Sequence, residues 1–270
     1  MNYLSPKEVT ENYSKIGLLK TTNKTSKIFV LAILAGMLIA FGSAATNTTA
    51  FAFTNISVIR IVTGLLFPFG LAMVVLLGAE LFTGNILISI SVLDKKVTIK
   101  GLIKNWITVY LGNLVGSLFI AAAMAYFGQL NYGNGMLAMY TINVAAIKCA
   151  MPFGNALVMG ITCNILVTLA VLMSMTAKDT LGKIAGAFVP VAFFVFAGYE
   201  HSVANMYYVP AGIFASKISE YYDMAMSMGI DMTNLNIMGF ITGNLIPVTL
   251  GNIIGGVIVS LIMWFSYSKK

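Results

Sequence analysis

Six apolar stretches, each close to the length that crosses a lipid bilayer, constrain the fold of this chain more than any other feature. They cover residues 28–46, 57–81, 103–127, 154–176, 181–198 and 241–266. A transmembrane helix needs about 20 apolar residues. Hydrophobic residues make up 59% of the chain and charged residues 9%, against about 25% charged in soluble domains. The sequence therefore predicts an all-α membrane protein: a leader over residues 1–27, then one transmembrane domain of six helices over residues 28–268.

Lysine placement predicts the orientation of these helices in the membrane. The basic clusters are Lys7 to Lys27 in the leader, Lys95 to Lys104 in the second connection, Lys178 with Lys183, and Lys269 with Lys270. Cytoplasmic loops are enriched in lysine and arginine, and the first connection, residues 46–55, has no charge. We therefore expect both termini to be cytoplasmic in a bacterial inner membrane. The lysine clusters of the cytoplasmic segments account for the net charge of +7, so the charge does not require a nucleic-acid partner.

The leader contains a helix start signal. Ser5, Pro6 and Glu8 read as an N-cap, a proline in the first turn and a capping-box glutamate. Val9 and Tyr13 follow at helical spacing, which predicts a short amphipathic helix. Such a helix serves either as a membrane-surface anchor or as a gate, and the sequence leaves both open.

The two halves of the chain resemble each other. Residues 105–116 and residues 244–255 both read N-x-I-x-V-x-L-G-N-x-x-G, and residues 78–85 and 198–205 both read G-x-E-x-x-x-x-N. The repeats extend over about 28–127 and 154–266. Each half holds three spans, so the halves must have opposite orientations in the membrane. The sequence thus predicts two inverted three-helix repeats, with helices 2 and 5 broken after residues 81 and 198 and continued by short apolar pieces at 86–93 and 206–214.

The breaks carry the residues most suited to chemistry. Non-helical backbone at membrane depth survives only inside protein or beside water, so residues 78–85 and 198–206 are expected to line a pathway. His201 takes the place that Leu81 holds in the other half, and a histidine can gain or lose a proton near neutral pH. We expect Glu80 and Glu200 to accept backbone N–H groups freed at the breaks.

Five further polar side chains are candidates whose roles differ. Lys148 is either a solvated loop lysine or a cation turned toward the pathway, and local sequence does not decide between these. Asn164 and Asn205 are expected to offer donors to a passing anion. Asn113 and its repeat partner Asn252 are expected to be helix-packing residues, because glycine precedes each.

Several motifs together resemble the formate/nitrite transporter family. They are Ser5-Pro6-x-Glu8, Ala79-Glu80-Leu81-Phe82-Thr83-Gly84-Asn85, Asn105-Trp106 with Gly112-Asn113, Cys163-Asn164, and Glu200-His201-Ser202-Val203-Ala204-Asn205. They occur in order over nearly the whole chain. The resemblance implies an aquaporin-like arrangement and a homopentamer with one pore in each protomer. It also implies transport of small anions such as formate, nitrite, hydrosulfide or lactate, and proton exchange with the permeating anion. Within the family, the chain's details resemble the hydrosulfide branch most.

The resemblance implies roles for individual side chains as well. His201 becomes the central protonatable group, with Thr83 hydrogen-bonded near it. The surrounding polar network would be Lys148, Asn164, Glu200 and Asn205. An outer apolar constriction would be formed by Phe67, Phe82, Val167 and Phe194, and an inner one by Leu71 and Leu81.

Two other functional classes fit the sequence less well. An aquaporin-like facilitator of small neutral solutes shares the six-span architecture, but neither break contains Asn-Pro-Ala, and a pore for neutral solutes has no need of Lys148. A membrane-embedded enzyme needs a nucleophile, metal cluster or cofactor motif. One histidine and the two cysteines, Cys149 and Cys163, have no such spacing, so we expect no enzyme activity, metal or cofactor.

Overall fold

The computed structural model describes residues 3–269 and shows a helical protein. Lys270, used above for the orientation, lies outside the described residues. Within residues 3–269, β pairing is limited to an isolated bridge between Tyr3 and Ala177. The expected all-α fold is confirmed.

Six of the helical segments are long and apolar enough to cross a membrane, and their bounds match the expected spans closely. They are α2 (Thr25–Ala50), α3 with α4 (Ile56–Leu66 and Pro68–Leu77), α7 (Ile99–Tyr126), α9 (Phe153–Thr176), α10 (Thr180–Ala197), and η3 with α13 (Gly239–Leu245 and Ile246–Tyr267). The observed bounds differ from the expected ones by no more than four residues. In a bilayer the backbone must satisfy its own hydrogen bonds, which is why apolar length predicts helical spans so well.

The second and fifth spans both end in a break, as expected. Helices α4 and α10 stop at Gly78 and Gly198, whose φ angles are +64° and +74°. Glycine adopts this left-handed conformation without steric cost, so the chain can turn sharply there. The chain then continues in short helices: α5 (Phe82–Asn85), η1 (Ile86–Ile88) and α6 (Ser89–Leu93) after the first break, and α11 (Ser202–Ala215) after the second.

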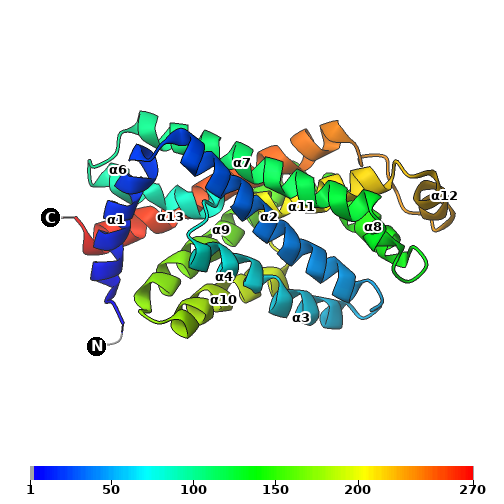
Figure 1. Cartoon of the computed structure of the whole chain (residues 1–270), viewed down its shortest axis with the longest axis horizontal. Coiled ribbons are helices and arrows are strands. Elements are labelled where there is room, and N and C mark those ends of the chain that lie inside the picture. The colour runs from blue at the N-terminus through cyan, green and yellow to red at the C-terminus, as the bar shows by residue number, and fades with distance from the viewer. Residues whose placement is uncertain (1–2, 270) are drawn as a thin grey trace.

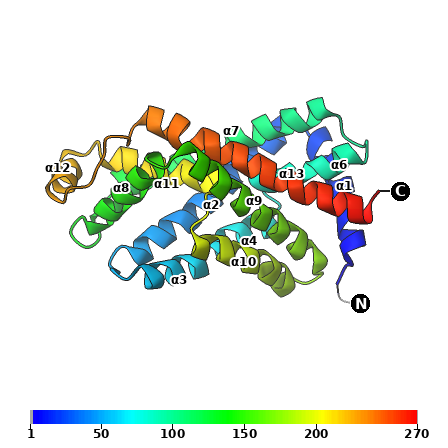
Figure 2. The same ribbon diagram turned by 180° about the vertical axis from the view of Figure 1, so that it is seen from behind.

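The spans pack as two similar sets. Helix α2 lies along α7 in the first half, and α9 lies along α13 in the second. Helices α4 and α10 contact each other and lie along the lower edge of the molecule (Figure 1 and Figure 2). The short helices α8 (Met136–Cys149) and α12 (Ser219–Ser227) lie at the end opposite to α1 (Figure 1). We call the two ends the α1 end and the α8 end.

The leader helix α1 (Pro6–Thr22) packs on protein. Its capping box is confirmed, because the Ser5 and Glu8 side chains bond each other's backbone N–H groups. Tyr13 is buried and donates its hydroxyl to the Gly84 carbonyl over 3.0 Å. Helix α1 therefore lies against the segment that follows the first break.

Candidate functional site

A small enclosed cavity lies between the two breaks. It is lined by Ile39, Phe67, Leu71, Leu81, Val167, Val191, Phe194 and His201. It offers about 10 Å³ to the centre of a water molecule, which is room for about one water. Five of the six expected constriction residues thus surround one point, and His201 is the sole polar side chain among these lining residues. The structure is closed to a hydrated ion here.

The hydrogen bonds of His201 define its protonation state. Its Nδ1 accepts the Ala204 backbone N–H over 3.0 Å and so caps the start of α11. A neutral imidazole has one N–H, and Nδ1 must be bare to accept. The proton therefore sits on Nε2, which lies 2.9 Å from the Thr83 hydroxyl. Thr83 accepts this N–H, and its own O–H remains available as a donor.

Aromatic rings hold the imidazole in place. The Phe194 ring stacks on it with centroids 5.9 Å apart, and the Phe67 ring meets it edge-on at 6.5 Å. His201 is 3% exposed. Any charge that reaches this point is thus surrounded by carbon, where an isolated ion is strongly disfavoured.

A buried ion pair lies beside His201, toward the α8 end. Lys148 donates from Nζ to Glu200 Oε1 over 2.7 Å, and Asn205 donates to Glu200 Oε2 over 2.7 Å. Lys148 belongs to α8 and its side chain is 16% exposed. It is therefore not a solvated loop lysine, and its ammonium has three N–H donors, one of which bonds Glu200.

The first half contains the same arrangement, and the sequence reasoning missed it. Lys20 of α1 donates to Glu80 over 2.8 Å, and Asn85 donates to the same carboxylate over 2.6 Å. Lys20 precedes Ala32 by twelve residues, as Lys148 precedes Gly160, and these two carbonyls accept from equivalent asparagines. The spacing from the lysine to the residue with the accepting carbonyl is thus the same in both halves. It is the sequence signal that could have identified Lys20 of the leader as the counterpart of Lys148 of α8.

The glutamates do not cap the breaks, contrary to the expectation above. The backbone N–H groups of Phe82 and Ser202 donate instead to the side-chain oxygens of Asn113 and Asn252, both over 2.9 Å. Each asparagine also donates to the carbonyl of the glutamate before its break, over 2.9 Å for Glu80 and 3.0 Å for Glu200. The expectation that these asparagines pack helices holds, since each donates to a carbonyl of the neighbouring span, Ala32 of α2 or Gly160 of α9. The bonds across each break are a second role that was not expected.

The resemblance groups Asn164 with Lys148, Glu200 and Asn205, but the hydrogen bonds of its side chain among the described residues go to other groups. Its Nδ2 donates to the carbonyls of Thr83 and Asn252, over 3.3 and 2.7 Å. It thus links the Thr83 segment to α13. Its Oδ1 is buried and has no hydrogen-bond partner among the described protein groups, so it could accept a bond from a passing protonated group or water.

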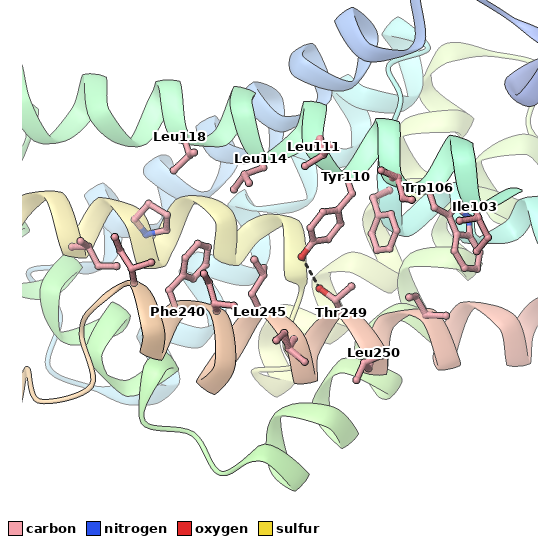
Figure 3. Close-up of a pocket in the computed structure, with 18 of the residues that line it drawn as sticks. Ile103, Trp106, Tyr110, Leu111, Leu114, Leu118, Phe240, Leu245, Thr249 and Leu250 are labelled. Carbon is pink, nitrogen blue, oxygen red and sulfur yellow. Dashed lines mark hydrogen bonds between the residues drawn. The ribbon is translucent and has the colours of Figure 1, made fainter. Parts of the chain in front are cut away.

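The Phe82 side chain does not line the cavity, unlike the other expected constriction residues. Its ring packs edge-on against Tyr110 and Trp106, with centroids 4.9 and 6.3 Å away. It forms part of a separate apolar groove of about 860 Å³ between α7 and α13, crossed by the hydrogen bond between Tyr110 and Thr249 (Figure 3). Thr83, the next residue of α5, instead meets His201 through its hydroxyl, so these two neighbouring side chains face different sides of the chain.

Known proteins match this chain over almost its whole length. Residues 7–265 match the family model described as formate/nitrite transporter. The formate channel FocA of Escherichia coli K12 is 38% identical over 274 residues, covering 99% of this chain and 95% of that protein. A probable formate transporter of Methanothermobacter thermautotrophicus is 36% identical over 288 residues, covering 100% and 99%.

Solved structures share the fold. One described as a pentameric formate channel with formate bound is 36% identical, with a TM-score of 0.80, over 91% of this chain and 98% of its own. Another, described as an FNT family ion channel, is 27% identical with a TM-score of 0.80, over 97% and 98%. These relatives are channels or transporters and not enzymes. With its six spans and paired breaks, this multi-pass membrane chain belongs to the formate/nitrite transporter family.

Proposed function

We propose that this protein is a channel for small monovalent anions of weak acids, with formate as its principal substrate. The observation that carries this proposal is the position of His201. It is the one polar group in an apolar cavity, it is hydrogen-bonded to Thr83, and the Lys148–Glu200 ion pair lies directly beside it. The formate channels among the relatives support the choice of substrate.

Attraction of the anion by a lysine and loss of its water are the first two steps of permeation. Lys148 at the α8 end and Lys20 at the α1 end each present an ammonium group, so an anion arriving from either side meets a cation. Charges near such a site raise the local concentration of counter-ions. The anion must then shed water, because the cavity has room for about one water.

Proton transfer at His201 makes the apolar passage possible. The resting neutral ring cannot give up its Nε2 proton without becoming an imidazolate, so the donor is the imidazolium. Charging the ring breaks the Nδ1 bond to Ala204 and places a cation at the N-terminus of α11, where it is disfavoured. An anion beside the ring offsets this cost. The ring takes up one proton from water on the side where the anion enters, and the imidazolium then gives a proton to the anion, leaving a neutral acid and a neutral histidine.

The assembly and location follow from the family and the charge pattern. We infer a homopentamer in the bacterial inner membrane, and a structural neighbour described as a pentameric channel supports this assembly. The lysine clusters put the α1 end and both termini in the cytoplasm and the α8 end outside. Residues 1–27 act as a leader helix docked on the channel domain of residues 28–268.

A panel of solutes in liposomes tests the substrate. Purified protein is reconstituted, and uptake of formate, nitrite, hydrosulfide, lactate, chloride and glycerol is measured at several pH values, together with proton movement. We expect formate to move fastest, with nitrite and hydrosulfide following as small weak-acid anions, and chloride to move far more slowly because it cannot be protonated usefully. Glycerol uptake without anion uptake would instead support an aquaporin-like facilitator.

Variants of His201 test the proton step. His201→Phe should abolish formate uptake, and His201→Asn should lose the pH dependence first. Tyr207→Phe is a matched control, because Tyr207 is a buried ring in the same helix α11. Robust formate uptake through His201→Phe, or chloride uptake equal to that of formate in the unmodified protein, would remove support for neutralisation.

A further inference from the structure

The buried asparagine Asn244 binds the backbone of the residue that attracts the anion. Its Nδ2 donates to the Lys148 carbonyl over 3.1 Å and lies 3.4 Å from Glu200 Oε2. Its Oδ1 accepts from Asn205 over 2.7 Å. Asn244 is fully buried. It therefore contacts both partners of the ion pair and leaves the Lys148 ammonium free to donate elsewhere.

The first half repeats this contact with a different helix. Asn105 of α7 donates from Nδ2 to the Lys20 carbonyl over 2.8 Å and accepts from Asn85 over 2.9 Å. Asn105 precedes Asn113 by eight residues, as Asn244 precedes Asn252. The lysine-bearing helices are otherwise dissimilar, since α1 is a polar leader and α8 an apolar helix. The bond from the asparagine to the lysine carbonyl is therefore present in both halves although the helices that carry the lysines differ. General similarity of helix packing does not explain it.

The local shape of the sixth span brings Asn244 to Lys148. Residues Gly239–Leu245 form a π-helical turn, which is uncommon and is often found at functional sites. Pro247 has no N–H, so the α-helical hydrogen bond from residue 247 to the Gly243 carbonyl cannot form there. A Cβ at Gly243 would lie 2.6 Å from the Cys149 carbonyl oxygen. Asn244 thus holds the Lys148 carbonyl, and Gly243 leaves room for the neighbouring Cys149 carbonyl at the end of α8.

A lysine side chain needs such support because its four-carbon stem is flexible. Holding the Lys148 backbone narrows the positions that Nζ can reach, without occupying any of its three donors. We propose that Asn244 is a positioning residue for Lys148: it fixes the end of α8, which Gly243 lets approach closely, so that the ammonium can bind Glu200 and an incoming carboxylate together. Asn105 holds Lys20 in the same way. This inference rests on the proposed function, because its readout is anion uptake.

The test compares the concentration dependence of formate uptake in liposomes. Asn244→Leu removes the bond to Lys148, and we expect the KM for formate to rise about fivefold, as for the loss of one hydrogen bond, with a smaller change in maximal rate. Gly243→Ala displaces the same backbone through the Cys149 carbonyl and should raise KM as well, which keeps the test open if Asn244→Leu assembles poorly. Thr242→Val is the matched control, because this exposed residue of the same turn bonds only the Met238 carbonyl.

A double variant separates positioning from general damage. In a Lys148→Gln background, Asn244→Leu should leave KM nearly unchanged, because there is no ammonium left to position. An equal rise in KM with and without Lys148, or no rise in either Asn244→Leu or Gly243→Ala, overturns the inference while the channel function stands. Absence of formate uptake by the unmodified protein would refute the proposed function, and this inference with it.

Discussion

Removing the charge of Lys148 should destabilise the protein and abolish attraction at the α8 end. Lys148→Met keeps the length of the side chain but leaves Glu200 without its cation. The pair is 2.7 Å long and its side chains are 16% and 4% exposed. Breaking such a pair from one side costs about 3–5 kcal/mol. Asn205 still donates to the Glu200 carboxylate, so we expect a value near 3 kcal/mol.

The double variant Lys148→Met/Glu200→Gln distinguishes stability from function. Removing both charges together is often neutral for stability, because no uncompensated charge stays buried. We therefore expect the free energy of unfolding to return to within about 1 kcal/mol of the unmodified value. Formate uptake at low concentration should remain depressed, since the attracting ammonium is still missing.

Two measurements on the same preparations check this reasoning. Denaturant unfolding in detergent, followed by tryptophan fluorescence, gives stability, and formate uptake by liposomes at low and high ionic strength gives attraction. Lys20→Met and Lys20→Met/Glu80→Gln form the matched set at the α1 end, where the side chains are 19% and 7% exposed. An unchanged unfolding free energy in Lys148→Met would refute the role of the pair in stability. Full uptake by the double variant would refute the role of Lys148 in attraction.

Four shorter predictions concern other groups. Thr83→Val removes the hydroxyl beside His201 Nε2 and should depress formate uptake strongly, while Thr83→Ser should keep most of it, as liposome uptake would show. Asn252→Leu leaves two buried backbone groups, the Ser202 N–H and the Glu200 carbonyl, without this partner and also removes the side-chain bond to the Gly160 carbonyl, so it should cost roughly 3 kcal/mol or more, measured by denaturant unfolding. The Ser5 N–H and hydroxyl hold the Glu8 pKa below its usual 4.5, so this carboxylate stabilises α1 above pH 4.5 and stops doing so as the pH falls through its lowered pKa. Amide hydrogen exchange in α1, corrected for its intrinsic pH dependence, should then become faster, and Ser5→Ala should reduce this dependence on pH. A membrane-impermeant amine reagent should label Lys269 only in inverted vesicles, and labelling of intact cells would contradict the proposed orientation.

The sequence alone determined the number of spans and the position of the breaks. Apolar length decides the spans, because backbone groups in hydrocarbon must bond within their own helix. Gly78 and Gly198 mark the breaks because a left-handed turn favours glycine. The pairing of Thr83 with His201 was also anticipated, through motifs shared with a known family.

Only the tertiary structure decided which side chains meet. Asn113 and not Glu80 caps the first broken helix, because that asparagine comes from a span 31 residues away, and no local pattern shows which side chain fills the gap. Phe82 turns away from the cavity and packs against Trp106 and Tyr110 of α7, a helix that the local sequence does not identify as its partner. The role of Lys20 depends on how α1 docks, and docking is set by contacts between segments far apart in the chain. Periodicity and composition describe one segment at a time, whereas these contacts exist only once the two halves have packed together.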